Sequence, residues 1–150
     1  MNKIQVRIMR LPHAADLPLP AYQSAHAAGL DLVAAVPAKG DPVVILPGSR
    51  AAIPTGLAFA LPSGMEGQIR SRSGLALHFG VAVLNSPGTL DADYRGELHV
   101  ILVNLGNEPF TVERGAKIAQ LVLSPTAQAS IHEVSSLEVS SLMSAGASRA

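Results

Sequence analysis

The sequence predicts an all-β domain with one short helix, and three observations support this. Thirteen glycines and eleven prolines recur along the 150 residues and separate short apolar runs, as in all-β proteins. Within several runs the apolar residues repeat with a period of two, which is the pattern of a half-buried strand. A single segment has helical character.

The strand pattern occurs in several segments along the chain. Apolar residues alternate over 4–8, 57–61 and 98–102, so each segment is predicted as a strand with a buried face. Residues 81–84 are apolar throughout and are predicted as a strand buried on both faces. A further apolar strand is predicted over 118–123, after a glycine turn.

The helix is predicted over residues 73–79. Ser73 can serve as its N-cap, because a serine hydroxyl accepts a hydrogen bond from the free N–H groups of a first turn. Leucine and alanine follow and favour a helix. All three phenylalanines fall in segments predicted to belong to the core: Phe59, Phe79 and Phe110.

The chain has the length of one domain, which we place over residues 1–134. From residue 135 onward the apolar periodicity fades, and six of the last sixteen residues are serine. We therefore predict a mobile, Ser-rich tail over residues 135–150.

The composition argues against several classes of function. Eleven basic residues balance eleven acidic ones, so neither a nucleic-acid partner nor an anionic membrane surface is expected. No run reaches the roughly 18 apolar residues of a membrane span, and the first residues lack the apolar core of a signal peptide. The sequence contains no cysteine, and its histidines lack the spacing of zinc ligands. We expect a cytoplasmic protein.

The segment from Gly88 to Gly96 holds two carboxylates, an aromatic ring and a guanidinium, more than a plain hairpin needs. Asp91 is the candidate catalytic residue, because a carboxylate fixed in a tight turn can orient a water and take its proton. Capping of its own turn is the open alternative. Asp93 is expected to be structural, for example in an ion pair with Arg95.

A second constellation suits phosphate. The Arg72 guanidinium can grip phosphate oxygens with two parallel bonds, and Gly74 lets backbone N–H groups approach. A helix that begins near Ser73 would point its positive end at the anion. Farther along, Gln120 offers an uncharged donor and Lys117 a cation.

Four motifs, in this order, resemble the first four motifs of the trimeric dUTPase family, and the resemblance covers about residues 28–120. They are residues 28–32 (AGLDL), 70–76 (RSRSGLA), 88–96 (GTLDADYRG) and 115–120 (GAKIAQ). The resemblance implies a distorted β-barrel, jelly-roll-like fold and a homotrimer. It also implies Mg²⁺-dependent hydrolysis of dUTP to dUMP and diphosphate, which keeps uracil out of DNA and supplies dUMP for thymidylate synthesis.

The resemblance implies roles for residues around the hairpin. Asp91 matches the aspartate that activates water, and Tyr94 matches a tyrosine that packs against deoxyribose and excludes a 2′-hydroxyl. Asn85 and the backbone near His99 would bind the uracil edge, because a carboxamide offers both a donor and an acceptor. The substrate-binding residues expected here are Asn85, Thr89, Leu90, Asp91, Tyr94 and His99.

On the phosphate side, Ser73 matches the serine at the oxygen that bridges the α and β phosphates, and Gln120 is expected to donate to phosphate. Asp31 matches the aspartate that holds Mg²⁺ through water, which suits a cation that keeps its waters and takes most direct ligands from triphosphate. The sites are expected between subunits, one giving Arg72, Ser73 and Gln120 and its neighbour giving Asn85, Asp91 and Tyr94; Gly74 is also expected to bind substrate.

Residues 135–150 do not match the family's fifth motif, a Gly-rich arm whose arginine grips the γ-phosphate and whose phenylalanine covers the uracil. We therefore expect turnover to be affected more than binding. Two alternatives stay open: a non-catalytic or weakly active dUTP-binding relative, and a dCTP deaminase, which shares the fold. The Asn85 and Asp91 pattern matches the dUTPase motif better than the glutamate base of a deaminase.

Overall fold

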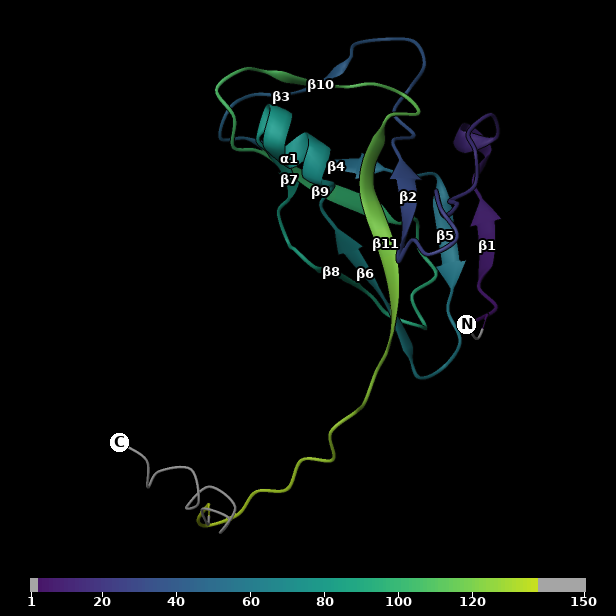
Figure 1. Cartoon of the computed structure of the whole chain (residues 1–150), viewed down its shortest axis with the longest axis vertical. Coiled ribbons are helices and arrows are strands. Elements are labelled where there is room, and N and C mark those ends of the chain that lie inside the picture. The colour runs from purple at the N-terminus through teal and green to yellow at the C-terminus, as the bar shows by residue number, and fades with distance from the viewer. Residues whose placement is uncertain (1–2, 138–150) are drawn as a thin grey trace.

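The computed structural model describes residues 3–137, and its fold is all-β with one short helix, as the sequence predicts (Figure 1). The strands are β1 (Arg7–Arg10), β2 (Gly29–Val33), β3 (Val43–Ile45), β4 (Arg50–Pro54), β5 (Leu57–Ala60), β6 (Met65–Arg70), β7 (Val81–Val83), β8 (Gly88–Leu90), β9 (His99–Asn104), β10 (Phe110–Val112) and β11 (Lys117–Pro125). The helical segments are the 3-10 turn η1 (Pro12–Ala14) and the helix α1 (Ser73–Phe79).

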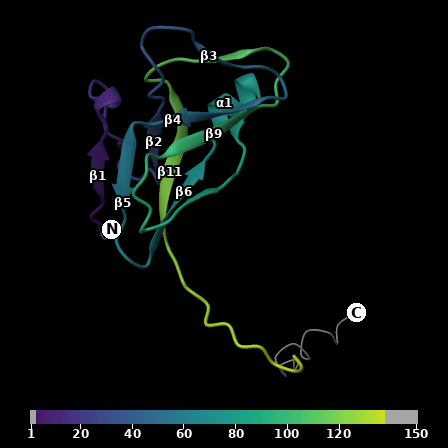
Figure 2. The same ribbon diagram turned by 180° about the vertical axis from the view of Figure 1, so that it is seen from behind.

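Two antiparallel sheets form the body. One has the strand order β2-β11-β6-β8 and the other the order β4-β9-β7. The long strand β11 pairs with β2 on one side and with β6 on the other (Figure 1). Two smaller pairs complete the fold: β1 lies beside β5 at one margin, and β3 pairs with β10 near α1 (Figure 2).

The sheets enclose one main apolar core. The predicted alternation over 98–102 is confirmed, because Leu98, Val100 and Leu102 are all buried there. Phe59 is the largest fully buried side chain and lies on β5. Every sheet contributes to this core, for example through Leu32, Ile45, Ile53, Ile69, Val83, Leu90, Val112, Ile118 and Leu121. The distorted, jelly-roll-like barrel therefore closes around residues that are far apart in sequence.

The helix has the predicted bounds, but its capping differs. Ser73 is the first helical residue rather than the N-cap, which is Arg72 in an extended conformation without a side-chain cap. The helix ends at Phe79, and the next residue, Gly80, caps it with a left-handed φ of 66°. A Cβ atom at Gly80 would lie 2.6 Å from the backbone nitrogen of Gly106, so a close backbone approach also requires glycine there.

Three other expectations are wrong in detail. The first strand begins at Arg7 instead of residue 4, and Ile4 is exposed. The strand over 81–84 ends at Val83, and Leu84 is exposed rather than buried. Phe79 is 54% exposed because α1 lies on the surface and buries none of its residues. Phe79 packs instead against Phe110, with ring centroids 5.4 Å apart.

After β11 the chain leaves the body, and residues 126–137 are exposed along an extended path (Figures 1 and 2). The predicted boundary at residue 134 stays a prediction, and residues 138–150 of the predicted tail lie outside the described residues. Between residues 3 and 137 no helix is long and apolar enough to cross a membrane.

Candidate active site

A cavity of about 280 Å³ opens between β8 and β9. Five of the residues predicted for the substrate site line it: Thr89, Leu90, Asp91, Tyr94 and His99. The first two belong to β8, the next two to the loop that follows, and the last begins β9. The structure therefore gathers the predicted base and sugar side of the site around one cavity.

The cavity exists because β8 and β9 belong to different sheets. β7 pairs with β9, and the backbone N–H of Leu84 still donates to the carbonyl of Ile101 at 2.9 Å. Beyond that point the chain turns away, and β8 pairs with β6 instead. Strands β8 and β9 are thus splayed apart, and the space between them is open.

The splayed edge of β9 presents backbone hydrogen-bonding groups. In an antiparallel strand, residues two apart direct their N–H and C=O groups to the same side. His99 lies two residues before Ile101 in β9. It therefore directs its backbone N–H and C=O groups to the side on which the Ile101 carbonyl binds the Leu84 N–H. Within residues 3–137 no strand pairs with His99 on that side. A planar base with donor and acceptor edges can be hydrogen-bonded there as an added strand would be.

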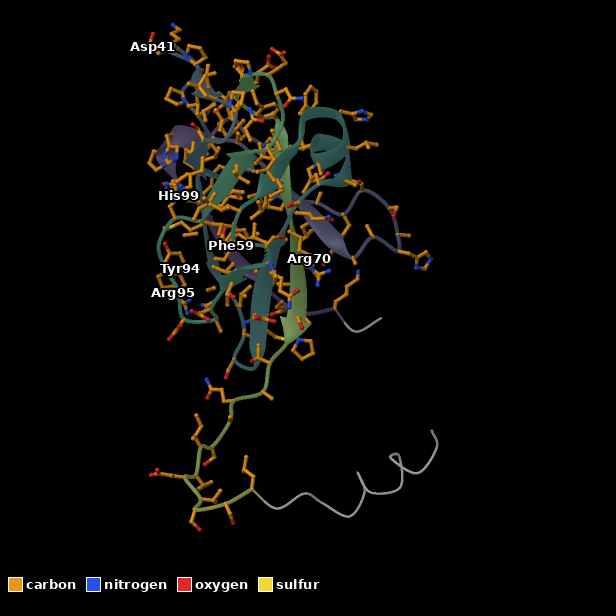
Figure 3. The ribbon with its side chains drawn as sticks, turned by 90° about the vertical axis from the view of Figure 1, so that its left-hand side faces the viewer. Asp41, Phe59, Arg70, Tyr94, Arg95 and His99 are labelled. Atoms are coloured by element: carbon orange, nitrogen blue, oxygen red, sulfur yellow. The ribbon has the colours of Figure 1, made fainter. Side chains whose placement is uncertain are left out.

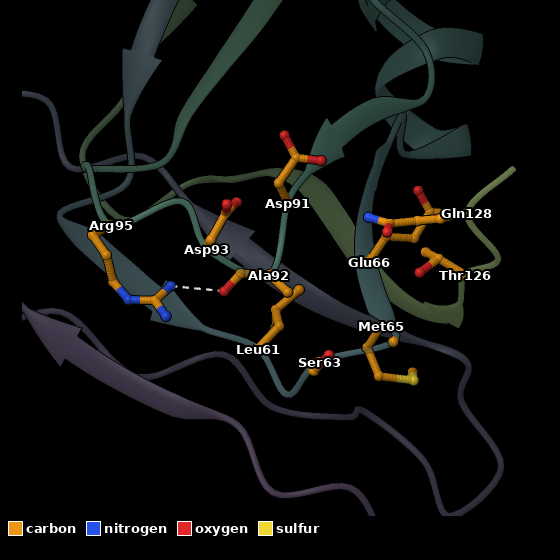
Figure 4. Close-up of a pocket in the computed structure, with 11 residues that line it drawn as sticks. Leu61, Ser63, Met65, Glu66, Asp91, Ala92, Asp93, Arg95, Thr126 and Gln128 are labelled. Carbon is orange, nitrogen blue, oxygen red and sulfur yellow. Dashed lines mark hydrogen bonds between the residues drawn. The ribbon is translucent and has the colours of Figure 1, made fainter. Parts of the chain in front are cut away.

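Asp91 lies at the end of β8, between this cavity and a second one of about 680 Å³ (Figure 4). The turn is closed by its backbone, because the Tyr94 N–H donates to the Asp91 carbonyl at 3.2 Å. Its exposed carboxylate accepts no hydrogen bond from any described residue. The side chain therefore does not cap its own turn and is available to a solvent molecule.

Arg95 does not pair with Asp93, contrary to our suggestion. Its guanidinium donates to the carbonyl of Ala92 at 2.7 Å and to that of Tyr94 at 2.9 Å, as Figure 4 shows for the first of these bonds. Among the described residues Asp93 has no ion-pair partner. Arg95 thus braces the loop from within by binding carbonyl groups.

Tyr94 folds back over the end of the same loop. Its hydroxyl donates to the Glu97 carbonyl at 3.1 Å. A Cβ atom at Gly96 would lie 2.5 Å from that hydroxyl oxygen, so the ring occupies the space that a larger residue would fill. The ring remains 46% exposed and lines the cavity, which leaves one face for a ligand.

The predicted phosphate side forms a separate charged cluster. Arg72 is ion-paired with one carboxylate oxygen of Asp31, and the Lys117 ammonium lies 2.9 Å from the other. Gln120 is paired with Asp31 across the β2–β11 ladder, and its side chain donates to the Ser71 carbonyl at 3.0 Å. Two cations around one carboxylate give the cluster a net positive charge, which suits a polyanion.

The Asp31 carboxylate also bears on the expected Mg²⁺. Its Oδ2 atom is buried and accepts no hydrogen bond from the described residues, since Lys117 approaches it outside hydrogen-bonding geometry. This oxygen is ion-paired with Lys117, and a carboxylate oxygen with a further lone pair fits a water-mediated contact to a hard cation. Within residues 3–137 no cluster of three or more acidic or histidine side chains could hold a metal directly.

The remaining predicted residues lie at the margins of these two groups. Ser73 and Gly74 form the first turn of α1 directly after Arg72, and a Cβ atom at Gly74 would meet nothing within 4 Å. Asn85 lies beyond β7, with its side-chain nitrogen 3.2 Å from where a Cβ atom of Gly88 would be. Asn85 is thus held at the start of β8, at the other end of that strand from Asp91.

The two groups of predicted site residues are not joined within one chain. Arg72, Ser73 and Gln120 are absent from the described lining of the 280 Å³ cavity. In Figure 3, Tyr94 and His99 lie along one margin, whereas Arg70, at the end of the strand that leads to Arg72, lies across Phe59 from them. Within residues 3–137 the phosphate cluster and the 280 Å³ cavity are thus two separate groups of predicted site residues.

The cavity also includes residues that the sequence did not single out: Ala52, Glu97 and Ile101. Ala52 and Ile101 are register partners on β4 and β9, and no local signal marks Ala52 because β4 is distant in sequence. Glu97 directly follows the Gly88–Gly96 segment. Its position beside that motif is the sequence feature that could have indicated a place in the site.

Comparison with known proteins identifies the family of this chain. A family model described as dUTPase matches residues 15–150. A curated protein of Methylocella silvestris, named deoxyuridine 5′-triphosphate nucleotidohydrolase, is 56% identical over 135 residues, which cover 90% of this chain and 84% of that protein.

Two solved structures share the fold. A mutant dUTPase from phage phi11 of S. aureus, described with a structural Mg(II) ion, has a TM-score of 0.78 at 22% identity and covers 90% of this chain and 99% of that chain. A mutant dUTPase of Staphylococcus bacteriophage 80alpha with dUpNHpp has the same TM-score, identity and coverage. At this level of identity, the two structures establish the fold alone.

Proposed function

The chain belongs to the dUTPase family, and we propose that it is a hydrolase that converts dUTP to dUMP and diphosphate with Mg²⁺. The observation that carries the proposal is the cavity between β8 and β9, because Asp91, Tyr94 and the free backbone edge of His99 meet there. Removal of dUTP would keep uracil out of DNA. The product dUMP would supply thymidylate synthesis in the cytoplasm.

In the proposed reaction, a water oxygen bonds to the α-phosphorus and the bond from that phosphorus to the α–β bridging oxygen breaks. Asp91 takes the proton of the attacking water, and the electron pair of the broken bond leaves with diphosphate. The free, exposed carboxylate at the end of β8 supports this role, because a general base must be reachable by water.

Base and sugar would be selected in the cavity and at its margin, where Asn85 lies. The free backbone side of His99 and the carboxamide of Asn85 offer donors and acceptors to a uracil edge, and cytosine would leave such groups mispaired, at about 1–3 kcal/mol each. Thr89 and Leu90 form the β8 wall. Tyr94 would pack on the deoxyribose and exclude a 2′-hydroxyl.

The triphosphate would bind at the positive cluster. Arg72 and Gln120 would donate to phosphate oxygens, with Ser73 and Gly74 at the bridging oxygen. Asp31 would hold Mg²⁺ through water, and the metal would supply charge neutralisation on the phosphates. Lys117 is close enough to Asp31 to contribute to the same field.

We also propose that the active protein is a homotrimer with its sites between subunits. The separation of the phosphate cluster from the base and sugar cavity supports this, because one nucleotide must contact both. Gel filtration with light scattering tests the trimer. Mixing Arg72→Ala with Asp91→Asn subunits tests the shared site, because mixed trimers would contain some sites with neither substitution and regain activity.

A diphosphate-release assay with dUTP, dCTP, dTTP and UTP in parallel tests the activity. We expect release from dUTP alone at low enzyme concentration. Ammonia release from dCTP would instead establish the deaminase, and protection by dUTP against thermal unfolding without turnover would establish a non-catalytic relative. The family match and the 56% identical nucleotidohydrolase favour neither of these alternatives.

A further inference from the structure

The loop after β8, residues 91–96, is hydrogen-bonded almost entirely to itself. The Tyr94 N–H binds the Asp91 carbonyl, and Arg95 binds two loop carbonyls. No hydrogen bond between this loop and any described residue beyond position 97 or before position 91 is present. Ala92 packs partly on the core and Arg95 lies beside β1 and β5, but the hydrogen bonds that fasten the loop to the body begin at its end, at Glu97.

Glu97 is the first residue after the loop that fastens it to the body. Its Oε1 atom accepts a hydrogen bond from the Gly56 N–H at 2.8 Å and lies 2.9 Å from the His13 Nε2 atom. Its Oε2 atom lies 3.9 Å from the His99 Nε2 atom. One carboxylate thus joins the loop to the turn between β4 and β5 and to η1 near the N-terminus.

The place where Glu97 attaches is tightly built. Gly56 has a φ of 68°, and a Cβ atom there would lie 2.1 Å from the Ala14 methyl carbon, so η1 packs directly on this turn. The Leu11 N–H also donates to the Gly56 carbonyl at 2.8 Å. The anchor is therefore closely packed, whereas most of the loop that it holds is exposed.

We propose that Glu97 is a positioning residue that sets the place of Tyr94 and, through it, the preference for deoxyribose over ribose. The Tyr94 hydroxyl donates to the backbone carbonyl of Glu97 itself, so the ring follows the orientation of that peptide. The N–H of the same peptide group, which belongs to Leu98, donates to the Leu57 carbonyl at 2.8 Å. The carboxylate anchor, the Leu98 hydrogen bond and the His99 ring, whose Nδ1 lies 3.2 Å from the same carbonyl oxygen, together fix this peptide. The effect on sugar preference rests on the proposed function, whereas the effect on the ring position does not.

The first measurement compares kcat/KM for UTP and dUTP in three variants. Glu97→Ala removes the anchor, and we expect the UTP to dUTP ratio to rise by up to about tenfold, which is the ratio that a difference of about 1.4 kcal/mol between the two substrates gives. Glu97→Gln keeps an oxygen acceptor for Gly56 and should restore most of the parent ratio. Glu113→Ala is the matched control, because Glu113 is exposed and its side chain has no hydrogen-bond partner among the described residues.

The second measurement needs no activity. The sequence has two tyrosines, Tyr22 and Tyr94, so protein labelled with 3-fluorotyrosine gives two fluorine NMR signals, which a Tyr22→Phe variant assigns. We expect the Tyr94 signal to shift or broaden in Glu97→Ala and to stay near the parent position in Glu97→Gln. The Tyr22 signal serves as the internal reference. His13→Ala, which leaves Glu97 intact, should move the Tyr94 signal in the same direction by less.

The outcomes separate the two proposals. An unchanged Tyr94 signal in a folded Glu97→Ala protein would overturn the positioning role. If Glu97→Ala does not fold, an unchanged Tyr94 signal in His13→Ala would overturn it instead. A shifted signal with an unchanged UTP to dUTP ratio would overturn the link to sugar preference. A parent protein that hydrolyses neither nucleotide would refute the proposed function, and the NMR result would still decide whether Glu97 positions Tyr94.

Discussion

The carboxylate of Asp31 is bound to the guanidinium of Arg72, 41 positions later in the sequence. The two residues lie on β2 and directly after β6, and β11 runs between these strands. A group expected to contact Mg²⁺ is thus paired with a group expected to contact phosphate. Arrival of a triphosphate and its cation would exchange this internal ion pair for one cation–carboxylate and one arginine–phosphate contact.

Asp31→Asn should weaken the contribution of Mg²⁺ while freeing Arg72. Because a residue that contacts a metal through water typically contributes 10–100-fold in affinity, we expect half-maximal activity at roughly tenfold higher Mg²⁺. In EDTA, a non-hydrolysable dUTP analogue should bind tighter than to the parent, since Arg72 no longer has a competing carboxylate. Titration calorimetry measures this, with the exposed Asp41→Asn as control. Weaker binding in EDTA would contradict the exchange.

Asp91→Asn should lower kcat for dUTP by at least about 10², the low end of the loss of a general base. The carboxamide has a similar shape, so the Kd of a non-hydrolysable analogue should change little. Asp93→Asn is the matched control, because that carboxylate is also exposed and lines the adjoining 680 Å³ cavity. An equal kcat in Asp91→Asn and the parent would remove Asp91 from the mechanism.

Tyr94→Ala should raise kcat/KM for UTP relative to dUTP, because the wall against a 2′-hydroxyl would be gone. The ring is 46% exposed, so we expect only a small change in Tm. Tyr22→Ala removes a ring of similar exposure outside the cavity and serves as control. If the ratio of the two substrates stays as in the parent, sugar discrimination lies elsewhere.

Asp16 and Arg114 should make stability depend on acid pH. Arg114 donates to the Asp16 carboxylate and to the carbonyls of His13 and Val36, and the Arg114 hydrogen bond holds the pKa of Asp16 below its ordinary value. A lowered pKa in the folded state stabilises the protein above the ordinary aspartate pKa of about 3.9. This stabilisation is lost as the pH falls from there through the lowered pKa.

Tm measured between pH 7 and pH 2 for the parent and Asp16→Asn tests this. The parent should have the higher Tm at pH 7, and the difference should shrink as the pH falls below about 4. A Tm difference that stays constant over the whole range would show that the aspartate charge contributes nothing. Asp41→Asn, at another exposed aspartate, controls for the loss of net charge.

Local patterns in the sequence predicted the helix and five of the eleven described strands, namely β1, β5, β7, β9 and β11. The period of two predicted the buried face of β9, and the helix from Ser73 to Phe79 was predicted with the bounds that the structure has. The polar turn between Gly88 and Gly96 was predicted as the place of the candidate catalytic residue, and Asp91 lies beside two cavities there. These features depend on residues within a few positions of one another, so local spacing is enough to indicate them.

Only the tertiary structure decided how those elements combine. The splaying of β8 from β9 depends on the pairing of β8 with β6, and the Asp31–Arg72 pair depends on the register of β11 with two other strands. Glu97 became important because Gly56 and His13 reach it from distant segments. Burial of Phe79 was wrongly predicted because the sequence does not say that α1 lies on the surface. Contacts between distant segments depend on strand register and sheet order, which no short stretch of sequence specifies alone.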